Sequence, residues 1–215
     1  GKADYFALAT MDEAVQLRQA GVRTALLILG PVQPADYARA AKHNVALTVS
    51  SLEEAKAISA CGEAAGKKIT VHFALDTGMS RIGFACTEEA AKEIQEAAML
   101  PGIIPEGLFS HFALADSKDK SYVNLQQSRF DRMIAWIGLE FPIRHLYNSA
   151  AIVELEPEYD MAREGIILYG LLPSNEVDLN RIGGVKSAMA LRSHVSFVKT
   201  LPAGREVSYG GTYVT

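Results

Sequence analysis

The chain has 215 residues, of which 49% are hydrophobic and 21% charged, and its formal net charge is -4; these proportions are typical of a globular protein with a sizeable core. Its basic residues are scattered, which argues against a nucleic-acid partner, and no apolar run reaches the roughly 20 residues of a membrane span. No signal peptide opens the chain and its two cysteines lack disulfide or metal spacing, so we expect a cytoplasmic protein without membrane contact from this segment.

Short apolar runs alternate with stretches of helical spacing over the first 170 residues. Met11–Ala20 has helical periodicity, Ser51–Ala60 begins with a serine cap and has Glu54 three residues on, and Thr87 opens a further helix. Seven apolar runs predict strands, at Tyr5–Thr10, Ala25–Gly30, Val45–Ser50, Ile69–Asp76, Gly107–Phe112, His145–Asn148 and Ile166–Gly170. Nearly all-apolar strands, most of them followed by a helix, predict a parallel sheet with both faces covered, in an α/β fold of the (β/α)8 TIM-type barrel class.

The strand count and the C-terminal pattern set the expected domains. Seven strands are one short of a closed barrel and the chain begins directly before a strand, so we expect a fragment whose first barrel strand is missing. After Gly183 the rhythm changes, because Ala188–Thr200 and Val207–Thr215 predict two strands of a hairpin joined by a turn. We therefore expect an incomplete barrel over residues 1–182 and the truncated start of a mostly-β C-terminal domain over residues 183–215.

Polar residues stand where the predicted strands end. They are Asp76, Arg81, His111, His145, Asn148, Ser149 and Arg163. Each alone has an ordinary structural explanation, but the carboxyl ends of barrel strands meet at one face, so together they predict a functional site. Arg81 offers a rigid fork to a carboxylate or phenolate oxygen. Asn148–Ser149 and Gly165–Ile166 offer hydroxyl and backbone N–H groups to a phosphate.

Other features narrow the chemistry. The chain has no Walker A or GxGxxG sequence, so a nucleotide is not the obvious owner of that phosphate, and no His/Glu cluster has metal-ligand spacing, so we expect no metal. We interpret His43, His72 and His194 as incidental. Tyr209 lies between Ser208 and two glycines, and a lone tyrosine in a strand is usually a core or interface residue.

Six strings of residues, in their order and spacing, carry a resemblance to a known family. They are DYFALAT at 4–10, DTGMSRIG at 76–83, GLFSHFA at 107–113, NSA at 148–150, AREGIILYG at 162–170 and VSYGGTY at 207–213. Over essentially its whole length the chain resembles the alanine racemases. The resemblance implies a barrel that holds pyridoxal 5'-phosphate (PLP), a C-terminal β domain and a homodimer with two shared active sites. It also implies an isomerase that interconverts L- and D-alanine and supplies D-alanine for peptidoglycan of the bacterial cell wall.

The family's two-base reaction gives three residues a role. With PLP the α-carbon proton of the amino acid becomes acidic, and racemisation then needs one base on each face of that carbon. One base is the family's cofactor-holding lysine, and the other matches Tyr209, which we expect to act in the partner subunit's site. Arg163 matches the arginine that faces the pyridine nitrogen and leaves it unprotonated. His145 matches the histidine in the network that joins this arginine to the tyrosine.

The remaining site residues follow from the same resemblance. His111 matches the histidine beside the cofactor ring. Ser149, Gly165 and Ile166 match contacts to the cofactor phosphate, the last two through backbone N–H groups. Arg81 matches the arginine near the cofactor's phenolate and the substrate carboxylate, and Asn148 stands with it as a supporting residue.

The sequence departs from the family pattern at three points. The family's cofactor lysine lies on the first barrel strand, and no lysine of this chain lies in that motif. Many members have a modified lysine where this chain has Ala74, so Arg81 must be oriented by something else, such as a bound anion or a neighbouring side chain. The C-terminal domain ends after its first hairpin, and we predict that the 215 residues alone show no racemase activity.

Two alternatives remain open. A serine-preferring racemase of the same family would share these residues, because substrate size is set by pocket residues that are not all present here. A non-catalytic PLP-binding barrel protein, involved in cofactor homeostasis, is a single-domain barrel, so the predicted hairpin and Tyr209 argue against it.

Overall fold

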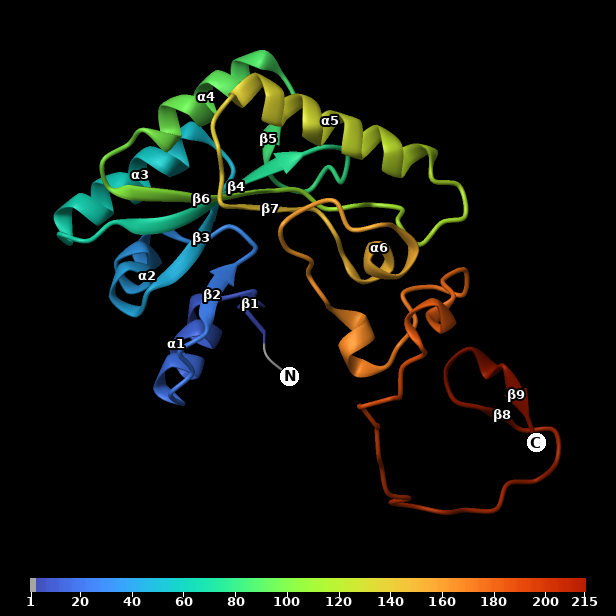
Figure 1. Cartoon of the computed structure of the whole chain (residues 1–215). Helices are drawn as coiled ribbons and strands as arrows, with labels where there is room; N and C mark the ends of the chain where they lie inside the picture. Colours follow the sequence, from blue (N-terminus) through green and yellow to red (C-terminus); the bar gives the residue numbers. More distant parts are fainter. Residues whose placement is uncertain (1–2) are drawn as a thin grey trace.

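The main sheet is parallel, and its strands follow one another in chain order around a curled surface (Figure 1). The computed structural model describes residues 3–215. The sheet runs through β1 (Tyr5–Leu8), β2 (Ala25–Ile28), β3 (Val45–Val49), β4 (Ile69–Asp76), β6 (Ile103–Phe109) and β7 (Ile143–His145), and the short β5 (Phe84–Ala85) pairs with the end of β4. This arrangement confirms the predicted α/β barrel class, with β1 and β7 at the edges of the described sheet.

Helices cover the outer side of the sheet. They are α1 (Met11–Gln19), α2 (Tyr37–His43), which follows η1 (Pro34–Asp36), α3 (Leu52–Ala64), α4 (Glu88–Ala98) and α5 (Ser121–Ile137), whereas α6 (Ser149–Glu154) lies near the strand ends, on the other side of β7 from α5. The predicted cap at Ser51 and the predicted helix start at Thr87 are confirmed, because each of these side chains accepts a hydrogen bond from the backbone N–H three residues on. The Glu54 side chain, however, accepts from the N–H of Ser50 and not of Ser51, so this helix lacks the reciprocal box that the sequence predicted.

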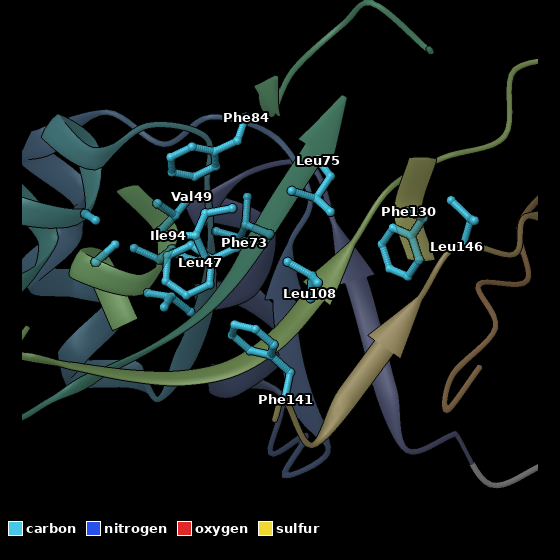
Figure 2. Packing of buried hydrophobic residues seen from close by; sticks show 14 of the residues in the cluster. Leu47, Val49, Phe73, Leu75, Phe84, Ile94, Leu108, Phe130, Phe141 and Leu146 are labelled. Carbon is cyan, nitrogen blue, oxygen red and sulfur yellow. The ribbon is translucent and has the colours of Figure 1, made fainter. Parts of the chain in front are cut away.

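The core lies between the curled sheet and these helices (Figure 2). All five residues of β3 are buried, since helices cover one side of the strand and other barrel side chains the other. Figure 2 shows Phe73 of β4 at the centre of this packing, next to Phe84 and Phe141, and both of these rings meet it edge to face. The sheet thus forms a rigid base from which the strand ends project.

Three predicted strands differ from the structure by more than two residues at an end or are not strands at all, whereas the first three end only one or two residues earlier than predicted. The run predicted at Gly107–Phe112 lies in β6, which begins earlier and ends at Phe109, and the run at His145–Asn148 is the end of β7 and the cap of α6. Ile166–Gly170 is no strand: Ile166–Tyr169 forms a 3-10 helix, η2, which ends at Gly170 with φ 74°. A short apolar run between two glycines has the composition of a strand or of a helical turn, and periodicity cannot separate the two.

The C-terminal prediction of two long strands is wrong. Residues 188–200 have no regular secondary structure, and the apolar side chains Leu191, Val195 and Phe197 are exposed. A strand needs a neighbour to pair with, and among the described residues this segment joins neither sheet; only its first residue, Ala188, bonds to another segment, through the Tyr169 carbonyl. After η3 (Leu179–Ile182), the chain forms only the small antiparallel hairpin of β8 (Glu206–Val207) and β9 (Tyr213–Val214), around the turn η4 (Tyr209–Gly211). Among residues 3–215, no helix is both long and apolar enough to span a membrane.

Candidate active site

Five of the predicted site residues gather at the carboxyl ends of β6 and β7, and we call His111, His145, Asn148, Ser149 and Arg163 the strand-end cluster. Arg163 reaches it from a segment that continues the sheet beyond β7. In this segment Met161 forms a parallel bridge with His145, and the Arg163 N–H donates to the Tyr147 carbonyl at 2.9 Å. The backbone thereby directs the guanidinium back over β7 towards β6.

Arg163 holds the two histidines of the cluster with one guanidinium. Its Nη1 lies 2.5 Å from His145 Nδ1, and its Nη2 lies 3.0 Å from His111 Nδ1 and donates to the Ser110 carbonyl at 2.7 Å. Burial, with the nearby charge of Arg81, lowers the pKa of Arg163 to about 10, which still leaves it cationic at neutral pH. Because a guanidinium only donates hydrogen bonds, both facing histidine nitrogens must be unprotonated acceptors.

The two histidines are therefore held in their neutral form. Burial, followed by the charges of Arg163 and Arg81, lowers the pKa of His111 to about 4. Burial and the charge of Arg163 also place the pKa of His145 well below its usual range, and His145 stacks on the Phe109 ring at 4.7 Å between centroids. With Nδ1 accepting from Arg163, each ring carries its proton on Nε2.

Asn148 and Ser149 begin α6 beside the same strand ends. The Asn148 side chain caps the helix by accepting from the Ala151 N–H at 3.1 Å, and its amide donates to the Phe112 carbonyl. Ser149 is buried, and its Oγ accepts from the Gly165 N–H at 2.9 Å. The structure thus brings together Ser149 and Gly165, and Ile166 begins η2 next to them. The Ser149 hydroxyl keeps its own proton to donate to a ligand.

Arg81 lies on the loop after β4 and is exposed. The Asp76 carboxylate shapes this loop by accepting from the N–H groups of Gly78 and Ser80, at 3.0 and 2.8 Å. Arg81, Ala74 and His111 line one small cavity of about 20 Å³, so the loop returns Arg81 to the strand-end cluster. Within the described part of the chain, neither Arg81 nor Arg163 makes an ion pair with a carboxylate.

The chain's likeness to known proteins agrees with this geometry. Residues 1–173 match the family model described as the N-terminal domain of alanine racemase. The chain belongs to this family. An alanine racemase of Desulforamulus reducens is 42% identical over 215 residues, which make up 98% of this chain and 58% of that protein.

Solved alanine racemase structures share the fold over the full chain. That of Clostridium difficile 630 superposes with a TM-score of 0.89 at 37% identity, over 100% of this chain and 57% of that one. That of Bacillus anthracis with bound L-Ala-P has a TM-score of 0.87 at 32% identity, over 99% of this chain and 56% of that one. The chain thus spans a little over half the length of the alanine racemases it matches.

Three α5 residues that the sequence did not single out hold this part of the alanine racemase fold together. Gln126, fully buried, donates to the Thr77 hydroxyl and the His111 carbonyl and accepts from the Ala113 N–H at 2.8 Å. Tyr122 and Arg129 donate to the Gly78 and Thr77 carbonyls of the Arg81 loop. The spacing of 122, 126 and 129 places them on one helix face, which is the only sequence signal that pointed to them.

His72 is a second residue that sequence reasoning missed. The prediction that His72 is incidental is wrong, because its side chain is fully buried on β4 and its Nδ1 lies 2.9 Å from His145 Nε2. A polar side chain within an apolar strand, two positions before Ala74, was the available signal.

Tyr209 lies apart from the strand-end cluster. It sits in the turn η4, and its side chain is fully exposed, at 101%. The preceding Ser208 and the following two glycines all have positive φ, so the turn presents the ring outward. In residues 3–215 no hydrogen bond joins Tyr209 to His145 or Arg163, and its expected action in a partner subunit stays a prediction.

Proposed function

We propose that the complete protein containing this chain interconverts L- and D-alanine with PLP as its cofactor, in a homodimer with two shared active sites. The observation that carries the proposal is the pair of arginines, Arg81 and Arg163, that converge on His111 without a carboxylate partner among the described residues. Two uncompensated cations beside a neutral imidazole form a site for an anion, and both PLP and an amino acid are anionic.

The donors of the strand-end cluster fit PLP. The Ser149 hydroxyl and the Ile166 N–H would hold its phosphate, joined by the Gly165 N–H once that group leaves Ser149 Oγ, to which it donates in this structure. His111 would lie beside its ring, and Arg163 would face its pyridine nitrogen. Bound there, PLP supplies an electron sink that makes the α-carbon proton of the substrate acidic. The chain also offers no group of three or more His, Cys, Asp or Glu residues, within 3–215, that is arranged to hold a metal ion.

The chain's own residues then orient the substrate and move one proton. Arg81 binds the substrate carboxylate, and Asn148 supports the site by capping α6 and donating to the Phe112 carbonyl. Arg163 does not give up its proton and only donates hydrogen bonds, so a pyridine nitrogen facing it would accept such a bond and stay unprotonated. Tyr209, from the partner subunit, exchanges a proton with one face of the α-carbon, and the family's lysine serves the opposite face.

Three further properties that membership of the family implies belong to the same proposal. The product D-alanine would serve bacterial peptidoglycan, and the enzyme would work in the cytoplasm. We also propose that residues 1–182 belong to the PLP-binding barrel and that residues 183–215 begin a β-rich C-terminal domain, since the hairpin of β8 and β9 lies there.

The test is a racemisation assay of the complete protein loaded with PLP. L-alanine, D-alanine and L-serine are each supplied, and both enantiomers of the product are measured by chiral chromatography. We expect interconversion of alanine with the highest kcat/KM. Absence of turnover by a protein that has demonstrably bound PLP would overturn the racemase proposal, and a preference for serine would overturn the choice of alanine.

A further inference from the structure

A line of polar side chains leads from Arg163 away from the strand-end cluster and across the inside of the curled sheet. Arg163 Nη1 contacts His145 Nδ1, and His145 Nε2 lies 2.9 Å from His72 Nδ1. His72 Nε2 lies 3.0 Å from a carboxylate oxygen of Glu106 on β6, and the same oxygen accepts from the Tyr5 hydroxyl on β1. His72 and His145 are both fully buried.

Hydrogen bonding permits one assignment of protons along this line. Arg163 only donates, so His145 Nδ1 accepts and its proton is on Nε2. That proton points at His72 Nδ1, which must therefore accept, so the His72 proton is on Nε2. At the far end the Glu106 carboxylate only accepts, and it takes the bonds from His72 and Tyr5. The cation at one end and the anion at the other thus polarise both imidazoles in the same direction.

The backbone is built to bring Glu106 and His72 together. The register between β4 and β6 shifts between Val71 and His72, because β6 carries an extra residue between Pro105 and Gly107. This bulged residue is Glu106, and a bulge re-aims a side chain that regular alternation would place elsewhere. A Cβ at Gly107 would lie 2.1 Å from His72 Nδ1, so only glycine leaves room for the imidazole.

The charges along the line agree with the assignment. The hydrogen bond from His72, and then the one from Tyr5, hold the pKa of Glu106 below its usual value, so it is ionised at neutral pH. Arg163 has no direct carboxylate partner among the described residues, and Glu106 is the anion to which it is linked through two imidazoles.

We infer that Glu106 and His72 are positioning residues, which hold His145 in its Nε2-protonated form and so keep its Nδ1 lone pair available to orient the Arg163 guanidinium. Without an acceptor at position 106, a proton on His72 Nε2 has no hydrogen-bond partner, so the form with the proton on Nδ1 becomes more stable. His145 must then move its own proton to Nδ1, where it points at the Arg163 N–H and breaks that contact. The effect on catalysis rests on the proposed function, whereas the proton positions do not.

The direct test reads the proton positions of His72 and His145 by ring nitrogen NMR, in the complete protein labelled with 15N-histidine, free of PLP and at neutral pH. In the wild type we expect a protonated Nε2 and an unprotonated Nδ1 in both rings. Glu106→Met removes the acceptor at similar size, and we expect His145 to populate the Nδ1-protonated form. Glu106→Gln keeps a carbonyl acceptor and should restore most of the wild-type pattern.

Tyr5→Phe is the matched control, because it removes the other bond to Glu106 but leaves the acceptor in place, so the wild-type pattern should persist. A protonated Nδ1 on His145 in the wild type would overturn the inference, whether or not the variants fold. An unchanged pattern in a folded Glu106→Met protein would overturn it as well.

Kinetics of the PLP-loaded variants separate positioning from loss of structure. We expect Glu106→Met to lower kcat by about 10-fold with little change in the KM for alanine, and Glu106→Gln to recover most of the loss. An unchanged kcat in Glu106→Met would overturn the catalytic part of the inference. If no variant and no wild type racemises alanine, the proposed function fails while the NMR result still decides the proton positions.

Discussion

The strand-end cluster and the Tyr209 turn differ in how much of their position the chain itself fixes. The Arg163 side chain makes three polar contacts within the described residues, whereas Tyr209 is fully exposed on a five-residue connection between two short strands. The sheet restricts the backbone at strand ends and so fixes the side chains there, whereas glycines leave the backbone of a turn largely unrestricted. The chain thus preorganises the half of the proposed site that binds anions and leaves the proton-moving tyrosine to be positioned by another surface.

The largest expected effect comes from Tyr209→Phe, which tests whether chemistry and stability are divided between these two regions. In the complete PLP-loaded protein we expect kcat to fall about 1,000-fold, because the phenol proton is lost from one face of the α-carbon. The free energy of unfolding should change by less than about 0.5 kcal/mol, since the hydroxyl makes no bond within the described residues. Chiral product analysis and urea unfolding measure the two quantities.

Tyr213→Phe provides the control for this variant, since it removes the hydroxyl of another exposed tyrosine four residues along. It should preserve both kcat and stability. A similar loss of kcat in the two variants would show that the hairpin acts through its general surface, and a Tyr209→Phe protein with wild-type kcat would remove Tyr209 from the catalytic assignment.

The strand-end cluster and the C-terminal segment also differ in how well they could be predicted from the sequence. The barrel strands were predictable because strands buried on both faces are continuously apolar, and β4 has the predicted bounds Ile69–Asp76. The polar residues at strand ends were predictable as a group because parallel strands bring their carboxyl ends to one face. Their approach in space, such as that of Arg163 to His111, follows the prediction.

The failures have physical causes that local pattern does not record. Glu106 was missed because a bulge changes the direction of its side chain, and the proline before it and the glycine after it read as ordinary strand interruption. Residues 188–200 have the alternation of apolar and polar side chains that is typical of a strand. A strand also needs a second segment to pair with, and alternation carries no information about such a segment. In both cases the deciding neighbour is distant in sequence.

A smaller effect is expected from Gln126→Leu, which removes hydrogen bonds that support the strand-end cluster. Removing the amide leaves the Ala113 N–H and the His111 carbonyl without their partner in a buried place. We expect a loss of about 2 to 3 kcal/mol in the free energy of unfolding of the complete protein, measured with urea.

Gln127→Leu is the matched control on the neighbouring position of α5, where the side chain is only partly buried and bonds to the exposed Glu158. This variant should lose less than about 1 kcal/mol. Equal losses in the two variants would contradict the view that the Gln126 network, and not helix α5 in general, secures the strand-end cluster.

The smallest effect concerns the charge state of His111, and it tests the fixed region without disturbing its packing. Burial and the two arginines lower the pKa of His111 to about 4, whereas the unfolded chain takes up a proton near pH 6.5. Above pH 6.5 the residue is neutral in both the folded and the unfolded state, so it does not change the free energy of unfolding. As the pH falls from 6.5 towards 4, only the unfolded state binds the proton, so the folded state loses stability progressively.

Between pH 7 and pH 5, this linkage should lower the stability of the PLP-free protein by about 1 kcal/mol, after allowance for partial solvent screening. His111→Gln, which cannot bind the proton, should lose less stability over the same interval, as measured by urea unfolding at each pH. A proton NMR titration of His111 with a midpoint near 6.5, or parallel losses in the two proteins, would mean that the arginines do not impose their charge on this imidazole. The anion-binding half of the site would then be less preorganised than its hydrogen bonds indicate, and its contrast with the Tyr209 turn would be smaller.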